Sequence, residues 1–197
     1  VVYYHRRPPV VADDAGHPIF PIRPDPRLLD AAARLGSMAD FLVITSNGVH
    51  MMQPVIEQAS GRKVVSMIDA TLSEVERRGL RRVGAIVFLG TNVYKEPLER
   101  IGLECLTIPD EMQKRLDVAI SALNEGKHDA EIRGAALDAV NWRRAQGTDG
   151  IILGCTEVPL MLRPVPCEAG QADEADASDL INPAQLLAEA VVRYAMD

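Results

Sequence analysis

Short runs of apolar residues alternate along the chain with longer stretches in which apolar residues recur every three or four positions. The first pattern is typical of strands buried on both faces, and the second of amphipathic helices. Strands are predicted over residues 41–45, 63–68, 82–89, 103–107 and 150–153. Helices are predicted over residues 26–38, 50–59, 70–78, 96–101, 110–124, 130–146 and 181–195. This alternation predicts an α/β fold in which parallel sheets are flanked by helices.

Two segments fall outside the alternating pattern. Six of the 13 prolines lie within the first 26 residues, although the chain opens on the strand-like run VVYY. Such a density of proline argues against a long helix or a central strand. Residues 164–179 are acidic and poor in apolar side chains, which predicts a loop or linker.

Composition and charge narrow the class of protein. The chain has 197 residues, of which 47% are hydrophobic and 4% aromatic, and its formal net charge is −7. An acidic chain lacks the electrostatic footprint for nucleic acid or an anionic membrane surface, and no apolar run reaches the roughly 20 residues of a membrane span. Three cysteines do not make a disulfide framework, which favours the reducing cytoplasm. No cluster of residues has metal-ligand spacing, so no metal is expected, and the composition favours a small-molecule partner.

Two stretches of the chain align with each other without gaps. They are ADFLVITSNGVHMM at residues 39–52 and TDGIILGCTEVPLM at residues 148–161. In each, an aspartate precedes an apolar strand that breaks into a polar turn, and Ser46 meets Cys155 in this register. The alignment reflects either a true duplication or the general likeness of two βα units. The shared aspartate and the Ser/Cys position favour duplication.

The turns after these two strands carry the candidate chemistry. In open parallel sheets, ligands bind beyond the carboxyl ends of the strands, where backbone N–H groups and the helix dipole favour an anion such as a carboxylate. The same setting is expected to lower the pKa of Cys155 from about 8.5 and to make a thiolate available. If two lobes face each other about a pseudo-twofold axis, Ser46 and Cys155 flank one substrate from opposite sides.

Four motifs resemble those of the aspartate/glutamate racemase family. They are GCTEVPL around Cys155, SNGVH around Ser46, the GTN turn at Gly90, and INPAQLLAEA near the C-terminus. The resemblance covers nearly the whole chain, and GCTE before an apolar helix is its most specific element. It implies two α/β lobes with the active site between them and no cofactor. It also implies that one cysteine removes the α-proton of an amino acid while a second returns a proton to the opposite face. By this resemblance, Cys155 is the second-lobe cysteine.

The first-lobe motif departs from the family pattern, which has cysteine, asparagine, threonine, any residue and then histidine. Here Ser46 replaces the cysteine and Gly48 the threonine, whereas Asn47 and His50 remain. A serine hydroxyl is a far weaker acid than a thiol, so it needs an activating base. His50 lies four residues on, on the same helix face, and either assists Ser46 or caps and packs locally. The outcome is a racemase biased in direction, a one-base enzyme, or a relative that has lost racemisation.

Further polar residues are candidates for binding the substrate. Asn47 and Thr156 cap helices, contact a substrate carboxylate, or do both, and Gly48 is a further candidate in the first turn. Thr91 and Asn92 are candidate carboxylate ligands, as the family resemblance also implies. Glu157 either complements the dipole of the following helix or orients Cys155. A dicarboxylic substrate also needs a cation, for which Arg7 is the candidate by position and loose resemblance, with a solvated arginine pair as the competing interpretation. Tyr94 is a weaker candidate, and Cys105 is expected to be buried and inert.

The sequence therefore predicts a two-lobed α/β enzyme, an amino-acid racemase that acts without a cofactor on aspartate, glutamate or a similar small dicarboxylate. Lobe 1 comprises residues 1–79 together with a returning helix within 180–197, and lobe 2 comprises residues 80–177. The repeat offset of 109 residues (155 − 46) places the counterpart of Val83 about 26 positions before Val1, so lobe 1 is expected to lack its first strand. A homodimer is a further expectation.

Two alternatives stay open at this stage. One is a single-cysteine decarboxylase or isomerase of small dicarboxylates, similar to arylmalonate decarboxylase, in which Cys155 protonates a planar enediolate. The other is a non-catalytic protein that keeps the cleft and has lost the first base.

Overall fold

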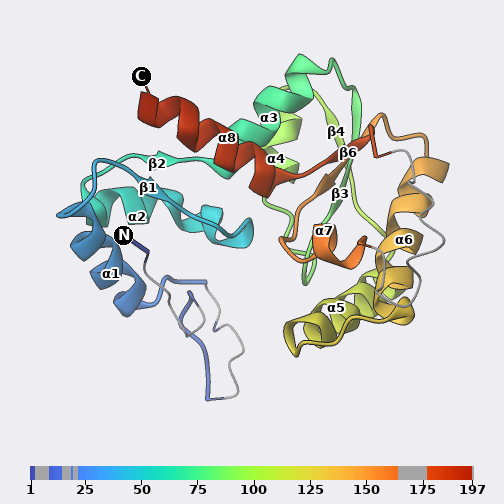
Figure 1. Ribbon diagram of the computed structural model, residues 1–197, viewed down its shortest axis with the longest axis horizontal. Coiled ribbons are helices and arrows are strands. Elements are labelled where there is room, and N and C mark those ends of the chain that lie inside the picture. The colour runs from blue at the N-terminus through green and yellow to red at the C-terminus, as the bar shows by residue number, and fades with distance from the viewer. Residues whose placement is uncertain (3–8, 15–18, 20–21, 164–176, 197) are drawn as a thin grey trace.

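The computed structural model describes residues 1–2, 9–14, 19, 22–163 and 177–196. Two separate parallel sheets lie on opposite sides of the molecule, with helices packed around each (Figure 1). The strands are β1 (Leu42–Val43), β2 (Val64–Val65), β3 (Arg82–Ile86), β4 (Glu104–Leu106), β5 (Gly150–Leu153) and β6 (Leu180–Ile181). The helices are α1 (Pro26–Gly36), the 3₁₀ helix η1 (Gly48–Met52), α2 (Gln53–Ser60), α3 (Met67–Arg77), α4 (Lys95–Arg100), α5 (Asp110–Asn124), α6 (Ala130–Ala145), α7 (Val158–Met161) and α8 (Pro183–Met196). The predicted α/β class is confirmed.

The smaller sheet pairs β1 with β2 in parallel and packs against α1 and α2. Helix α1 begins where the Asp25 side chain accepts a hydrogen bond from the backbone N–H of Arg27, with proline in the first helical position. It ends at Gly36, where α1 and α2 approach closely. A Cβ built on Gly36 would lie only 2.0 Å from the carbonyl oxygen of Ser60, so only glycine allows this contact.

The larger sheet has the strand order β4-β3-β5-β6, and all its neighbouring pairs are parallel. All four residues of β5 are buried, which agrees with a strand covered on both faces. Helices α5 and α6 share a core cluster with Ile151 and Leu153. On the opposite face, residues of α3 and α4 share a second cluster with Val83 and Ile152. The alternation of side chains along β5 thus divides the core of this sheet into two layers.

Helices α3 and α8 connect the two sheets (Figure 1). Helix α3 directly follows β2 of the smaller sheet, yet its residue Val75 packs with the core of the larger one. Helix α8 follows β6 of the larger sheet, and its residue Leu187 packs with Val65 and Met67 near the smaller one. The last helix begins at Pro183, two residues later than predicted, because residues 180–181 pair with β5. The division of the chain into lobes at residue 79 stays a prediction.

The strands are shorter than the apolar runs predict. Strand β1 spans two residues, and Val43 within it is 37% exposed, whereas both residues of β2 are buried. Strand β3 ends at Ile86 rather than at Leu89. Leu89 and Gly90 both adopt left-handed conformations, with φ of 50° and 64°, and therefore turn the chain out of the sheet. These early strand ends leave room for polar turns at the edges of the sheets.

Arg143 is an unusual member of the core. It is 1% exposed, and among the described residues Nε and Nη2 of its guanidinium have no hydrogen-bond partner. Its carbon Cζ lies 4.4 Å from the ring centroid of Trp142. Burial lowers the pKa of Arg143 to about 10, because the charged form is poorly solvated there. The guanidinium therefore opposes folding by its desolvation cost.

Replacing Arg143 with methionine is expected to stabilise the protein by about 1 kcal/mol, because an apolar side chain of similar length removes that desolvation cost. Thermal unfolding should shift upward by roughly 2–4 °C. The neighbouring Arg144 is the matched control, since it forms an ion pair with Asp179 at 2.6 Å. Arg144→Met should lower the melting temperature. A lower melting temperature for Arg143→Met would show that the buried charge has a stabilising partner.

Among the described residues, no helix combines the length and the apolar character that crossing a membrane requires.

Candidate active site

Three strand-end turns meet between the two sheets. They follow β1, β3 and β5 and comprise residues 46–48, 87–94 and 154–157. The hydroxyl of Tyr94 donates a hydrogen bond to Asn47 Oδ1, which joins the first turn to the second. A Cβ built on Gly154 would lie 3.3 Å from Tyr94 Cε2, so the same ring packs against the third turn. A Cβ on Gly48 would lie 4.0 Å from Thr91 Cγ2. The carboxyl ends of the strands therefore form one candidate site, as the strand–turn pattern predicts.

Cys155 lies in the third turn and is 7% exposed. Its thiol donates a hydrogen bond to Glu157 Oε2 at 2.9 Å, and the Thr156 hydroxyl donates to the same oxygen at 2.8 Å. One carboxylate oxygen thus orients both side chains. This geometry favours the interpretation in which Glu157 orients Cys155.

The pKa of Cys155 is raised, to about 12, whereas the sequence predicts a lowered one. Burial is the largest cause, because it penalises the thiolate, and the carboxylate of Glu157 adds to the effect. The helix that follows, α7, has only four residues, so its dipole is too small to compensate. In this structure Cys155 is therefore a protonated thiol at neutral pH, held next to a group that can accept its proton.

Replacing Glu157 with glutamine is expected to lower the pKa of Cys155 by roughly one to two pH units, because the negative charge that disfavours the thiolate disappears. The thiolate is measured by its absorbance near 240 nm against pH, in a background in which the two other cysteines are alanine. The exposed pair Lys127–Glu125 supplies a matched control, and Glu125→Gln should leave the titration unchanged. An unchanged or raised pKa in Glu157→Gln would show that this carboxylate does not control the thiol.

Ser46 lies at the start of the first turn and is half-buried. His50, in η1, is 6% exposed, and both of its ring nitrogens are bonded to the backbone. Nδ1 donates to the carbonyl oxygen of Ser46 at 2.8 Å, and Nε2 accepts from the backbone N–H of Met67 at 3.0 Å. Burial lowers the pKa of His50, which favours the neutral ring that this pattern requires. His50 therefore packs locally, and its ring fixes the backbone of Ser46 rather than activating the hydroxyl.

In the second turn, the side chains of Thr91 and Asn92 have different surroundings. The Asn92 side chain is engaged on both sides: Oδ1 accepts from the backbone N–H of Tyr94 at 3.0 Å, and Nδ2 donates to Cys105 Sγ at 3.3 Å. Thr91 is exposed next to Gly48. Asn92 thus shapes the turn, and Thr91 remains the better placed of the two to contact a substrate. Burial raises the pKa of Cys105, in agreement with an inert thiol.

Arg7 and Tyr94 are the remaining candidates from the sequence. Arg7, the candidate cation, lies outside the described residues. Sequence reasoning also missed the part that Tyr94 plays between the turns. Its partner Asn47 is 47 positions away in the chain, and no local pattern links the two. Among the described residues, no group of three or more histidine, cysteine and acidic side chains could hold a metal ion.

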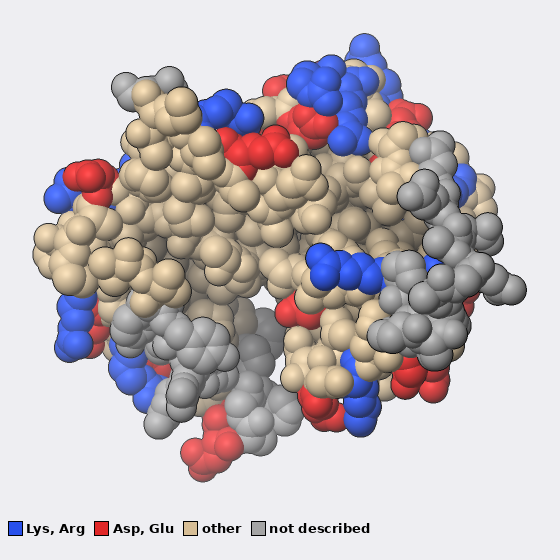
Figure 2. Space-filling model, in the orientation of Figure 1, with Lys and Arg blue, Asp and Glu red and all other residues tan. Residues whose placement is uncertain are grey.

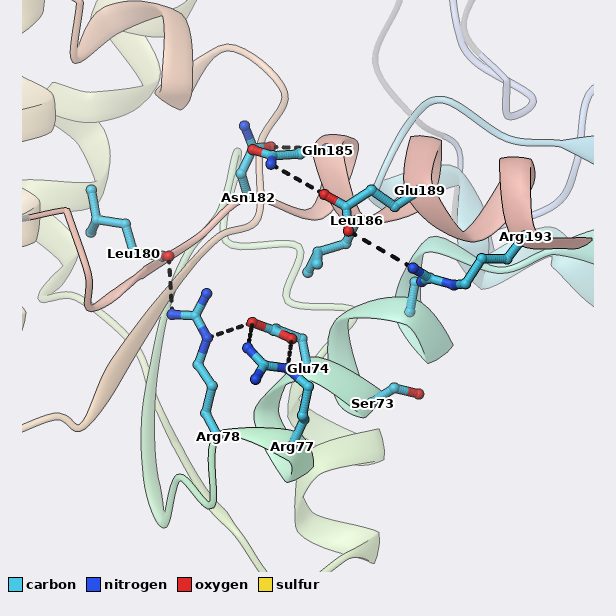
Figure 3. A pocket seen from close by; sticks show the side chains of 11 residues that line it. Ser73, Glu74, Arg77, Arg78, Leu180, Asn182, Gln185, Leu186, Glu189 and Arg193 are labelled. Atoms are coloured by element: carbon cyan, nitrogen blue, oxygen red, sulfur yellow. Dashed lines mark hydrogen bonds and ion pairs between the residues drawn. The ribbon is translucent and has the colours of Figure 1, made fainter.

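A separate groove of about 570 Å³ lies between α3 and α8 and contains none of the candidate residues. Figure 3 shows Arg77 and Arg78 directed at Glu74, and Arg193 at Glu189. Arg77 and Arg78 lower the pKa of Glu74 to about 2. Each of these three arginines therefore has an acidic partner within the groove. The face of the molecule drawn in Figure 2 has charged side chains of both signs around its rim and a mostly uncharged centre.

Comparison with known proteins identifies the family. The model of the Asp/Glu/hydantoin racemase family matches residues 17–191, so this α/β protein belongs to that family. A crystal structure of a Yersinia pestis protein provisionally described as an Asp/Glu racemase has a TM-score of 0.72 and 27% identity, covering 87% of this chain and 74% of its own. An aspartate racemase homologue from Pyrococcus horikoshii OT3 gives a TM-score of 0.69 and 25% identity over the same shares. An uncharacterised protein from Pectobacterium carotovorum subsp. carotovorum is 32% identical over 113 residues, which are 54% of this chain and 73% of the relative.

Proposed function

We propose that this protein is an amino-acid racemase that acts without a cofactor on aspartate, glutamate or a similar small dicarboxylate. The observation that carries the proposal is the Cys155 thiol, which is hydrogen-bonded to Glu157 at the carboxyl end of β5. The turn bearing Ser46 and Asn47 reaches this region through Tyr94. Membership of the racemase family supports the same reaction. Homodimer formation and a cytoplasmic location stay predictions.

The proposed reaction begins with proton transfer from Cys155 to Glu157. The resulting thiolate removes the α-proton of the substrate and becomes a thiol again, and the electron pair of the broken C–H bond is delocalised onto the substrate α-carboxylate. Ser46 Oγ–H then delivers a proton to the opposite face of the α carbon. Ser46 regains a proton from water, and Glu157 releases its proton to water, which closes the cycle. Asn47 and Thr91 are the proposed side-chain donors to the carboxylate, since the Thr156 hydroxyl already donates to Glu157.

This scheme predicts a direction-biased enzyme. Abstraction by Cys155 requires a thiolate, whereas abstraction by Ser46 requires an alkoxide, which is much harder to form. His50 does not relieve this difficulty, because its ring nitrogens are bonded to the backbone. The two enantiomers have equal free energy, so racemisation always ends at a 1:1 mixture. The bias therefore concerns the rates of proton exchange and not the final ratio of enantiomers. The enantiomer whose α-proton faces Cys155 should exchange faster.

A second candidate function follows from the protonated state of Cys155. A thiol whose pKa is raised to about 12 holds its proton at neutral pH and can act as an acid. Such a group suits a single-cysteine decarboxylase or isomerase, in which it protonates a planar enediolate formed from a small dicarboxylate. A non-catalytic role in binding the same ligands is the remaining alternative.

One experiment separates these functions. The full chain is incubated in D₂O with L- and D-aspartate and with L- and D-glutamate, and α-deuterium is followed by NMR while chirality is followed by chiral chromatography. Racemisation predicts deuterium incorporation and inversion together. Exchange with retained configuration indicates one-base chemistry. Absence of exchange for all four amino acids contradicts the racemase proposal, and substituted malonates then test decarboxylation directly.

A further inference from the structure

A buried chain of hydrogen bonds runs behind the candidate site. It starts at the carbonyl of Ser46, which accepts from His50, and continues from His50 to the backbone N–H of Met67. The Thr71 hydroxyl donates to the carbonyl of Met67 at 2.8 Å and lies near the Tyr94 hydroxyl. These bonds therefore tie the first turn of α3 to the turn that follows β1.

Tyr94, from the turn that follows β3, makes a second bond to the turn at which this chain begins. Its hydroxyl donates to Asn47 Oδ1, the residue next to Ser46. Tyr94 and Thr71 are 0% exposed and Asn47 is 4% exposed, so water does not compete for these bonds. The Ser46–Asn47 turn is thus held at two points: through its backbone by His50, and through its amide side chain by Tyr94.

The ring of Tyr94 also contacts the opposite turn. Gly154 directly precedes Cys155, and a Cβ there would lie 3.3 Å from Tyr94 Cε2 and 2.9 Å from Val87 Cγ1. The backbone leading to Cys155 therefore rests against the ring whose hydroxyl holds Asn47. One rigid side chain spans the space between the two turns that carry the candidate acid–base groups.

The donor direction of the hydrogen bond decides how the amide is used. Burial raises the pKa of Tyr94, so its hydroxyl stays protonated and donates. Since Asn47 Oδ1 accepts this bond, Nδ2 is the remaining polar group of the amide, and it can only donate. No hydrogen bond between described residues uses Asn47 Nδ2. A carboxylate is the natural partner for such a donor.

We propose that Tyr94 is a positioning residue: it holds the Asn47 amide so that Nδ2 donates to the substrate carboxylate, and its ring sets the spacing between the Ser46 turn and Cys155. This inference rests on the proposed function, because it concerns a dicarboxylic amino acid in the same site. Tyr94 does not exchange a proton with the substrate. Its effect on the reaction passes through Asn47.

The test is a double-mutant cycle between Tyr94 and Asn47. Tyr94→Phe keeps the ring and removes the hydroxyl, and should raise KM at least about tenfold with a smaller fall in kcat, because the carboxylate donor becomes mobile. In an Asn47→Ala background, Tyr94→Phe should change KM by less than about twofold, since its partner is already gone. Independent, multiplying effects of the two substitutions would overturn the inference.

Thr71→Val is the matched control for stability. It removes a buried hydroxyl from the same chain of hydrogen bonds without touching Asn47. Tyr94→Phe and Thr71→Val should lower the melting temperature to a similar extent, while Thr71→Val changes KM by less than about threefold. If both variants raise KM equally, Tyr94 is a structural residue and the inference fails.

Binding separates failure of this inference from failure of the proposed function. Calorimetric titration of L-aspartate and L-glutamate into Cys155→Ala requires no chemistry, and the added Tyr94→Phe should weaken binding at least about tenfold. If the wild-type protein does not racemise but this loss is seen, the positioning role holds and the racemase proposal fails. If Cys155→Ala binds neither amino acid, or binds equally with and without the Tyr94 hydroxyl, the positioning role is overturned.

Discussion

Cys155→Ala is expected to lower α-proton exchange by about a thousandfold or more, because it removes the group that takes and returns the proton on one face of the substrate. The loss should appear in kcat with little change in substrate affinity, since the carboxylate donors remain in place. Deuterium incorporation into aspartate and glutamate measures this loss over a wide range of rates.

Two variants make the interpretation of Cys155→Ala specific. Cys155→Ser keeps a hydrogen-bond donor to Glu157 but supplies a much weaker acid, so it should retain about 1% of the activity or less. Cys105→Ala removes a half-buried thiol that accepts a hydrogen bond from Asn92 and should retain most of the activity. Full exchange activity in Cys155→Ala would mean that the reaction does not use Cys155 and that the site is wrongly assigned.

The second large effect is a higher rate of racemisation when Ser46 is replaced by cysteine. Ser46→Cys is expected to speed racemisation by about 10- to 100-fold, because a thiol ionises near pH 8.5 and a hydroxyl does not ionise in the accessible range. The gain should grow as the pH rises towards 8.5, since the thiolate fraction grows with it. Initial rates of racemisation from each enantiomer, measured between pH 6.5 and 9, test this directly.

The direction of the gain is as informative as its size. Exchange of the enantiomer whose α-proton faces residue 46 should gain more than exchange of the other, because only that half-reaction needs a base at this position. Ser46→Ala is the matched control and should lower racemisation, since the hydroxyl that returns the proton is lost. If Ser46→Cys and Ser46→Ala both match the wild type, residue 46 takes no part in the reaction.

The candidate turns could be predicted from the sequence because each depends on neighbouring residues. An apolar strand followed by a polar turn places Cys155 at the carboxyl end of β5, and the same pattern places Asn47 beyond β1. Hydrophobic periodicity is a local property, and it is enough to predict strand, turn and helix in order. The four-residue spacing also predicts that His50 lies near Ser46, although His50 contacts the carbonyl oxygen of Ser46 and not its hydroxyl.

Other features of the site depend on groups that are far apart in the chain. The pKa of Cys155 depends on the burial of its turn, and a dipole argument from the sequence therefore gave the wrong direction. Tyr94 follows a GTN turn and gives no local sign that its hydroxyl meets Asn47. The sequence also contains no local sign that α3, which follows the smaller sheet, packs against the core of the larger one.

The amino-acid pattern alone was sufficient for the α/β class, the order of the first five strands, and the motifs that relate the chain to the racemases, whereas β6 was missed. These follow from the spacing of apolar residues and from short runs of residues, which need no knowledge of distant contacts. The tertiary structure was needed for the protonated state of Cys155, the backbone role of His50 and the bridge made by Tyr94. Desolvation and buried hydrogen bonds depend on which segments meet in space, and only the folded chain brings those segments together.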